Sequence, residues 1–222
     1  MSHQNARCAS AAETLVVATG KSLPAVGDLS GKDLVVVQGT ASGVLTWALT
    51  TQPPMSIVGQ STGTITGVGI PGPTPTPVHL TGGDVYLRNL TITGGSPGLL
   101  ADGGGVVRLD HVSVINNPGT GIAIDGSAFD IRDATVTGNG SGSAGGTGIV
   151  LKNLSTAPTG PKSITLSTVS NNQAGIACAT ASDVPATTSG VLVSGNTTLG
   201  DIGPACNFTS CGAASTTCGA QP

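Results

Sequence analysis

Short runs of Val, Ile and Leu recur along the chain, and each run is closed by a turn rich in Gly, Asn or Asp. Apolar and polar residues alternate within the runs, as at Leu87, Leu90 and Ile92, with an offset at a small bend. Alternation of this kind predicts β-strands that bury one face. The hydrophobic pattern therefore favours an all-β protein built from short strands.

The runs are organised as internal repeats. Apolar strands begin near residues 78, 99, 122, 149 and 176, so successive repeats are 21, 23, 27 and 27 residues long. Each repeat has a short strand, a tight turn, a longer strand and a closing Gly or Asn turn. Looser runs before residue 78 indicate two or three further coils.

The links between repeats are too short to hold the crossover helix of an ordinary parallel sheet. Each strand is therefore expected to pair with its copy in the next repeat, about 4.8 Å away. This predicts a single-stranded parallel β-helix, a solenoid of about seven to eight coils. Residues 1–222 are expected to form one domain, with a lead-in or cap at 1–30, coils at 31–200 and a Cys-rich tail at 201–222.

Three segments carry a resemblance to a known family: SIVGQSTGTITG, VYLRNLTITGG and VRLDHVSVINN. They resemble repeats of the right-handed parallel β-helix proteins of the pectin-lyase-like superfamily, over residues from about 30 to 200. The resemblance implies a right-handed coil, which agrees with the usual hand of parallel connections. It implies no single activity, because the superfamily includes lyases, hydrolases, epimerases, tailspikes and adhesins.

The composition limits the classes of partner that the chain is expected to bind. Only 9% of the 222 residues are charged and 2% are aromatic, and the net charge is −3. Eight Lys and Arg give no basic stripe, so a nucleic acid is not an expected partner. No stretch approaches the roughly 20 apolar residues of a membrane span. The apolar content of 38%, arranged in regular runs, is enough to form a core.

The positions of the five cysteines indicate whether the protein resides in an oxidising compartment. Three of them lie in the weakly apolar tail, where disulfides would compensate for a missing core. The disulfide candidates are Cys178, Cys206, Cys211 and Cys218, and Cys8 is expected to be the unpaired one. Zinc is a weaker explanation, since C-x4-C-x6-C without a nearby His is a poor ligand pattern. Disulfides predict an extracellular or cell-surface location.

Stacking the repeats produces columns of charged residues. The columns are Arg88, Asp110 and Arg132; Tyr86, Arg108 and Asp130; and Asn89, His111 and Asp133. Together they predict one polar face, whose candidate catalytic residues are Arg88, Arg108, Asp110, His111 and Arg132. The resemblance implies that an Arg could act as the base beside a uronate. Alternating opposite charges are also typical of a structural ladder, which we favour.

Two further features of the sequence could bind calcium. Asp102 and Asp125 occupy equivalent turns and could form half of a Ca²⁺ site or a glycosidase pair. Each precedes a Gly, as a tight turn requires, and Lys152 follows in the next repeat. The segment LDHVSV is similar to the Asp-His segment of pectate lyases, but Arg88 and Arg132 flank Asp110. We therefore expect no cofactor, with Ca²⁺ as the alternative.

Two uncharged columns complete the pattern. Asn116, Asn139 and Asn171 are expected to stack at strand ends and bond from coil to coil. Thr91-x-Thr93 and Thr135-x-Thr137 suggest an ice-binding array, which we disfavour because Ser113 and Ile115 intervene and the last repeats do not continue it. The loops 141–146 and 182–190 are expected to tolerate insertions.

These observations favour a secreted or surface-exposed protein without an active site, in a structural, adhesive or self-assembly role. The open ends of a solenoid carry unpaired strand edges, so the expected partner is a second copy that stacks end to end. The alternative is a lyase or hydrolase that acts on an acidic polysaccharide, bound at the polar face.

Overall fold

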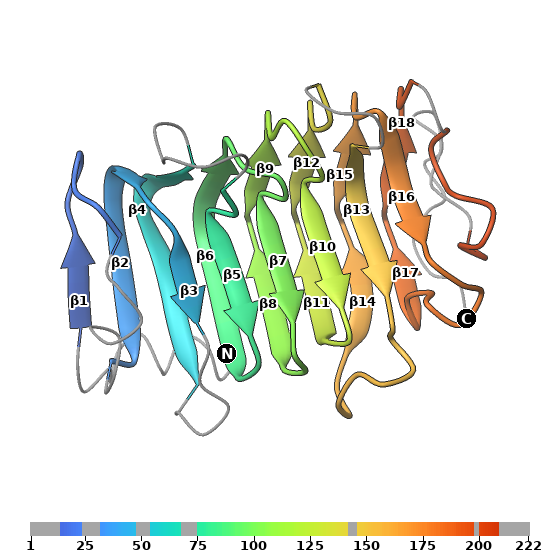
Figure 1. Cartoon of the computed structure of the whole chain (residues 1–222), viewed down its shortest axis with the longest axis horizontal. Helices are drawn as coiled ribbons and strands as arrows, with labels where there is room; N and C mark the ends of the chain where they lie inside the picture. The colour runs from blue at the N-terminus through green and yellow to red at the C-terminus, as the bar shows by residue number, and fades with distance from the viewer. Residues whose placement is uncertain are drawn as a thin grey trace.

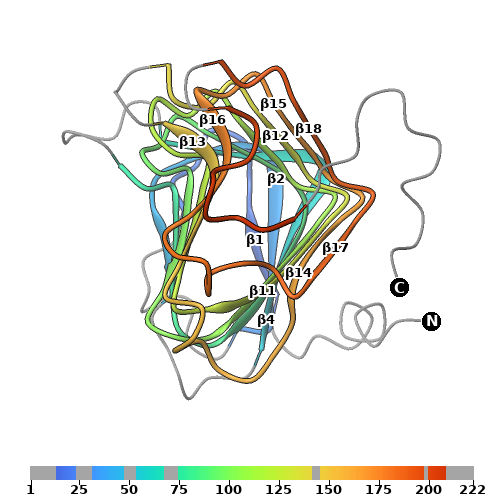
Figure 2. The ribbon, with the colours of Figure 1, turned by 90° about the vertical axis from the view of Figure 1, so that its right-hand side faces the viewer.

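The computed structural model describes residues 14–23, 32–47, 54–67, 75–141, 146–197 and 200–208. Regular structure in these ranges is β throughout, and all strand pairs are parallel. The strands wind into an elongated solenoid (Figure 1), and successive coils superimpose in the view along its axis (Figure 2). The predicted all-β parallel solenoid is confirmed.

The larger sheet has twelve strands in eight levels. Its first four levels are single strands: β1 (Thr14–Val17), β2 (Leu34–Ser42), β4 (Met55–Thr66) and β6 (Asp84–Thr93). The next four are strand pairs: β8 (Val106–Asp110) with β9 (Ser113–Ile115), β11 (Ala128–Arg132) with β12 (Thr135–Thr137), β14 (Lys162–Thr165) with β15 (Thr168–Ser170), and β17 (Thr187–Ser189) with β18 (Leu192–Ser194).

The smaller sheet has six strands: β3 (Leu45–Trp47), β5 (Val78–Thr81), β7 (Leu99–Asp102), β10 (Ile122–Asp125), β13 (Thr147–Lys152) and β16 (Ala174–Cys178). The described residues thus make about six complete turns, fewer than the seven to eight expected coils. The larger sheet has additional levels at both ends, and β1, within the expected lead-in, is the first of them.

A column of left-handed residues divides the larger sheet lengthwise. Asn89, His111, Asp133, Leu166 and Gly190 all have φ between 50° and 63°. A left-handed residue interrupts the extended backbone, so each level bends there and two flat half-sheets result. The first half-sheet contains the first part of β6 with β8, β11, β14 and β17. The second half-sheet contains the end of β6 with β9, β12, β15 and β18.

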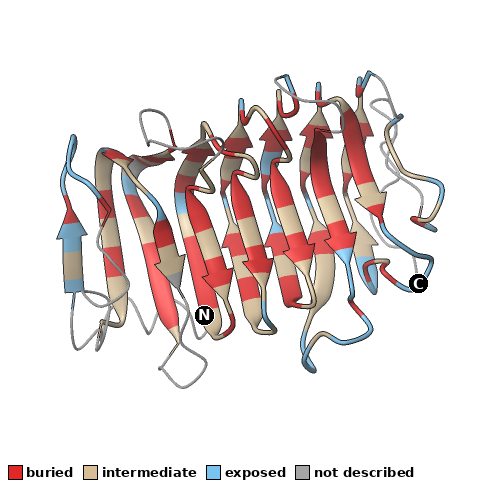
Figure 3. Cartoon of the chain, in the orientation of Figure 1, coloured by how far each residue is buried: buried red, intermediate tan, exposed pale blue. Residues whose placement is uncertain are grey.

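The core is a stack of aliphatic side chains inside the coil. Leu87, Leu109, Ile131 and Ile164 lie in register on successive strands, and each is at most 1% exposed. Buried and partly exposed positions alternate along most of the strands (Figure 3). The alternation read from the sequence therefore identifies the buried face correctly.

The asparagine column differs from the prediction. Asn139 is buried and bonds to Asn117 and Asn172, whereas Asn116 and Asn171 lie one residue earlier, exposed and left-handed. The buried column runs Asn117, Asn139, Asn172, Asn196 and ends on the carboxylate of Asp201. The expected column mixed two neighbouring positions, because Asn occupies both positions at 116–117 and at 171–172.

This column also explains the Gly that closes each repeat. A Cβ on Gly121 would lie 2.8 Å from Asn139 Nδ2, and one on Gly148 would lie 2.8 Å from Asn172 Nδ2. Only Gly leaves room for the stacked amides next to the following strand. The repeat-closing Gly is therefore a packing requirement of the asparagine column.

Candidate functional site

Ion pairs connect the charged side chains of the first half-sheet across its levels. Arg108 Nη1 contacts Asp84 Oδ1, and Arg88 Nε lies 3.7 Å from Asp110 Oδ2. Arg88, Asp110 and Arg132 lie in register, as do Tyr86, Arg108 and Asp130, so the predicted columns are confirmed. This face therefore has nearly balanced charge, because cations and carboxylates alternate between levels.

Asp110 is the centre of the polar face. The Tyr86 hydroxyl donates a 2.7 Å hydrogen bond to Asp110 Oδ2, and His111 Nδ1 lies 2.7 Å from Oδ1. Partial burial raises the pKa of Asp110, but the hydrogen bonds from Tyr86 and His111 and the charges of His111 and Arg88 outweigh it. The net pKa of Asp110 is below its ordinary value. Asp110 is consequently an anion at neutral pH.

His111 bridges two carboxylates. Its Nε2 lies 2.8 Å from Asp133 Oδ2, while its Nδ1 contacts Asp110. Both His111 and Asp133 are left-handed bend residues, so the bend column aims their side chains at one another. A doubly engaged imidazole has neither nitrogen free to accept a substrate proton.

The remaining residues of the face make separate contacts. Asp130 accepts a 2.6 Å hydrogen bond from the Ser163 hydroxyl. Arg132 is exposed at the end of β11, between the levels of Asp110 and Thr165. The structure thus brings Arg88, Asp110 and His111 together, but it places Arg108 on Asp84, a residue that the sequence analysis did not single out.

The two turn carboxylates also have partners of their own. His79 Nε2 lies 3.0 Å from Asp102 Oδ1, and Asn153 donates a 2.6 Å hydrogen bond to Asp125 Oδ1. Lys152 is in register with Asp125, as expected. Within the described ranges, no three His, Cys, Asp or Glu residues are grouped to hold a metal ion. The geometry agrees with the turn interpretation of both residues.

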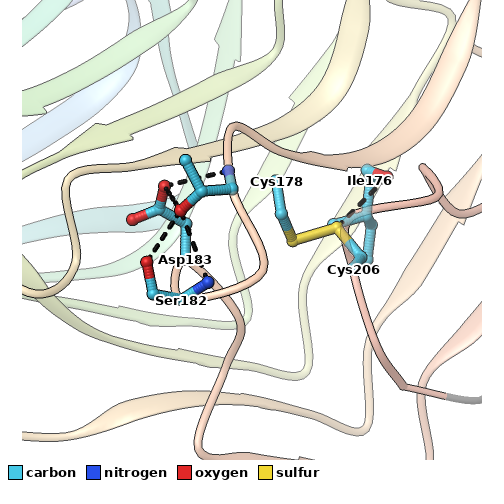
Figure 4. The surroundings of a disulfide bond; sticks show 6 residues. Ile176, Cys178, Ser182, Asp183 and Cys206 are labelled. Atoms are coloured by element: carbon cyan, nitrogen blue, oxygen red, sulfur yellow. Dashed lines mark hydrogen bonds between the residues drawn. A yellow bond between two sulfur atoms is a disulfide. The ribbon is translucent and has the colours of Figure 1, made fainter.

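A disulfide joins Cys178, at the end of β16, to Cys206 in the C-terminal segment (Figure 4). Both cysteines are at most 9% exposed. Cys8, Cys211 and Cys218 lie outside the described residues, so their pairing stays a prediction. The disulfide fixes residues 200–208 against the last coil, where Ile202 forms an isolated bridge to Ile176.

The loop 182–190, which was expected to tolerate insertions, contains an anchored side chain. The segment 182–190 contains Asp183, whose buried carboxylate accepts hydrogen bonds from the Leu154 and Thr180 amides at 2.7 and 3.1 Å. Thr180 Oγ1 donates a further bond to the same carboxylate (Figure 4). That side chain ties two loops together, so we expect the loop 182–190 to tolerate insertions only away from Asp183.

Comparison with known proteins agrees with this architecture. Residues 55–198 match a family model described as a right-handed β-helix region. No curated protein and no solved structure matches the chain. No helix long and apolar enough to cross a bilayer occurs among the described residues. Since the family match covers more than half of the sequence and the coordinates form a parallel solenoid, the chain belongs to the right-handed β-helix family.

Proposed function

We propose that the chain is a non-catalytic β-helix protein of the cell exterior or surface, with a structural, adhesive or self-assembly role. The observation that carries this proposal is the pairing on the polar face. Arg108 is bound to Asp84, Asp110 accepts from Tyr86, and His111 lies between two carboxylates. Side chains engaged with each other are suited to hold coils in register.

Catalysis would require a different arrangement. A lyase needs a base that can take a proton, and a retaining hydrolase needs two carboxyl groups on either side of one bond. Here Asp102 and Asp125 each contact a separate partner, and Arg88 lies beside Asp110. These contacts support a structural role for the charged residues.

The disulfide supports an exterior location. Cys178–Cys206 links segments 28 residues apart, and such bonds persist in oxidising compartments. Low charge and a rigid parallel core are also compatible with a durable surface element. Mass mapping of protein recovered from its own cells, under non-reducing conditions, tests this part of the proposal.

The decisive experiment is a search for polymer cleavage. Full-length protein is incubated with polygalacturonate, alginate and related polymers, with and without Ca²⁺, and absorbance at 235 nm and reducing ends are followed. The expected result is no product above the blank. Product formation that is lost in Arg108→Ala would overturn the proposal.

A lyase or hydrolase of an acidic polysaccharide is the second candidate. It is favoured by the convergence of Tyr86, Arg88 and His111 on the ionised Asp110. The matched variants are Asp110→Asn, at the centre of the cluster, and Asp125→Asn, on a turn of the other sheet. Cleavage lost only in Asp110→Asn would establish this candidate, whereas cleavage by neither wild type nor variants would eliminate it.

A further inference from the structure

The second half-sheet carries two parallel columns of hydroxyl side chains. The pairing of β2, β4, β6, β9, β12, β15 and β18 aligns fourteen outward positions in seven levels, and twelve are Thr or Ser. One column is Thr40, Thr64, Thr91, Ser113, Thr135, Thr168 and Leu192; the other is Ser42, Thr66, Thr93, Ile115, Thr137, Ser170 and Ser194.

The hydroxyl columns extend further than expected from the sequence. In the sequence, Ser113 and Ile115 interrupt the Thr-x-Thr pattern, and the last repeats are expected not to continue it. Thr168 is in register with Thr135, and Ser170 with Thr137, so the array does continue. It also extends backwards through Thr64 and Thr66 of β4. The links of unequal length lie earlier in each repeat, before β8, β11, β14 and β17, and they hid the register in the sequence.

The array is regular in two directions. Neighbouring levels of a parallel sheet are about 4.8 Å apart, and residues i and i+2 on one face are roughly 6.6 Å apart. The residues between the columns, such as Ile92, Val114 and Val136, are fully buried and anchor the strands to the core. Thr137 Oγ1 lies 3.4 Å from Ser170 Oγ, so adjacent hydroxyls of a column approach one another. The core therefore holds the hydroxyls at nearly fixed spacing.

The chemistry of this face points to an uncharged, ordered ligand. None of the fourteen positions carries a charge, whereas the first half-sheet holds Asp84, Arg88, Arg108, Asp110 and Arg132. None is aromatic, although stacking on aromatic rings is the usual means of holding sugar rings on a flat surface. Each Thr combines a methyl group with a hydroxyl that both donates and accepts.

We infer that this hydroxyl array is a binding surface for ice. Ice presents its water molecules at regular intervals along perpendicular directions, so an array that is regular in two directions can meet them at many positions. A rigid face of this kind can bond to ordered water at many points without further loss of side-chain freedom. The inference supplies a ligand for the proposed non-catalytic role and rests on that role.

The test is ice activity of the full-length protein. The expected results are a gap between melting and freezing temperatures, faceted crystals, and fluorescently labelled protein on the surface of a growing ice hemisphere. Thr135→Tyr places a ring in the middle of the array and should reduce the temperature gap to that of buffer. Thr165→Tyr, on the first half-sheet, is the matched control and should leave the gap unchanged.

Several outcomes overturn the inference. Wild-type protein without ice shaping overturns it directly and needs no variant. Equal activity of Thr135→Tyr and wild type overturns the assigned surface, and Thr91→Tyr replaces that variant if circular dichroism shows misfolding. Two further results, each in the absence of ice activity, would assign the face to another occupant. One is capture of the protein by crystalline cellulose or chitin, and the other is a dimer that Thr135→Tyr dissociates. If the protein neither binds ice nor cleaves polymers, only this inference fails. If it cleaves polymers, the proposed function fails.

Discussion

Single residues in this protein often act through a column rather than alone. Asp110 is an example, since its contacts with Tyr86 and Arg88 join two adjacent levels of the larger sheet. A cross-strand pair on an exposed face contributes little by itself, but every level of a solenoid depends on its neighbour. The effects of such substitutions should therefore appear in stability.

The lowered pKa of Asp110 predicts a dependence of stability on acid. A carboxyl group whose pKa is lower in the folded state stabilises the fold above its unfolded pKa, near 4, and loses this contribution as the pH falls through the folded pKa. The free energy of unfolding of Asp110→Asn should consequently fall less than that of wild type from about pH 5 to pH 2. Urea titrations across this range measure the difference. Tyr86→Phe should be intermediate, and parallel curves for all three proteins would contradict the argument.

Leu166 predicts a stabilising substitution. It is a left-handed residue in the bend column, with φ of 50°, and its side chain is 57% exposed. Left-handed backbone costs an ordinary L-residue about 1 kcal/mol, and Asn tolerates it better. Leu166→Asn should therefore raise the unfolding free energy by about 0.5–1 kcal/mol. Leu166→Ala is the control in urea melts, because it removes apolar surface and keeps the strain; equal gains would disprove the role of strain.

At the scale of elements, the turns of the solenoid depend on buried hydrogen bonding. From Asn139 onwards, each side-chain oxygen of the asparagine column accepts from the previous residue of the column, and each side-chain nitrogen donates to the next one. Asn172 Oδ1 accepts from the backbone N–H of Asn139 at 3.0 Å, and Asn172 Nδ2 donates to the backbone oxygen of Val136 at 3.1 Å. Because these groups are buried, no water replaces a lost partner.

Asn172→Ala should consequently lower the free energy of unfolding by about 2–6 kcal/mol, since it leaves two buried backbone groups unpaired at about 1–3 kcal/mol each. Thermal and urea melts measure this loss. The matched variant is Asn171→Gly, next to it in the chain, which is exposed and left-handed and should leave stability nearly unchanged. Similar losses in both variants would show that the column is not the important feature.

The C-terminal segment is an element that depends on a covalent bond. A disulfide closing a loop of 28 residues is expected to stabilise a fold by about 3–4 kcal/mol. The double variant Cys178→Ala with Cys206→Ala should show this loss in urea melts. Reductant should destabilise wild type more than the double variant, which lacks this bond. Unchanged stability of the double variant would mean that residues 200–208 dock without the bond.

At the scale of the whole molecule, the C-terminal end of the smaller sheet is covered by the segment that follows it. Residues 200–203 cover the outer edge of β16, through bonds from Gly175 N to Gly200 O and from Ile176 N to Asp201 O. Such coverage blocks an edge that would otherwise pair with another chain. The disulfide holds this cover in place.

Loss of the disulfide should therefore promote association. We expect the double cysteine variant to scatter more light than wild type and to form end-to-end particles in negative-stain images. Both proteins are kept in reductant-free buffer after alkylation of free thiols, so that new intermolecular disulfides do not contribute. A variant that stays monomeric at every concentration would show that the C-terminal end does not mediate assembly.

The sequence predicted more of the fold than of the site. Periodic apolar residues and short turns require each strand to pair with its copy, so the parallel solenoid and the columns around Asp110 followed from residues 78 to 196. The contact of Arg108 with Asp84 did not follow, because neighbouring columns offered several carboxylates of equal spacing. The expected asparagine column was one residue early at Asn116 and Asn171, since adjacent asparagines there hide which one faces inwards.

By itself the sequence determined the winding of the chain. Apolar residues at every second position, separated by tight turns, can be buried if each strand pairs with its copy in the next repeat. It also determined which side chains face outwards on each strand. Only the tertiary structure decided which outward residues meet across repeats of unequal length, since their loops change the sequence spacing between paired residues. The seven-level hydroxyl array is the clearest case: its members are separated along the chain by 22 to 33 residues, and only strand pairing places them in line.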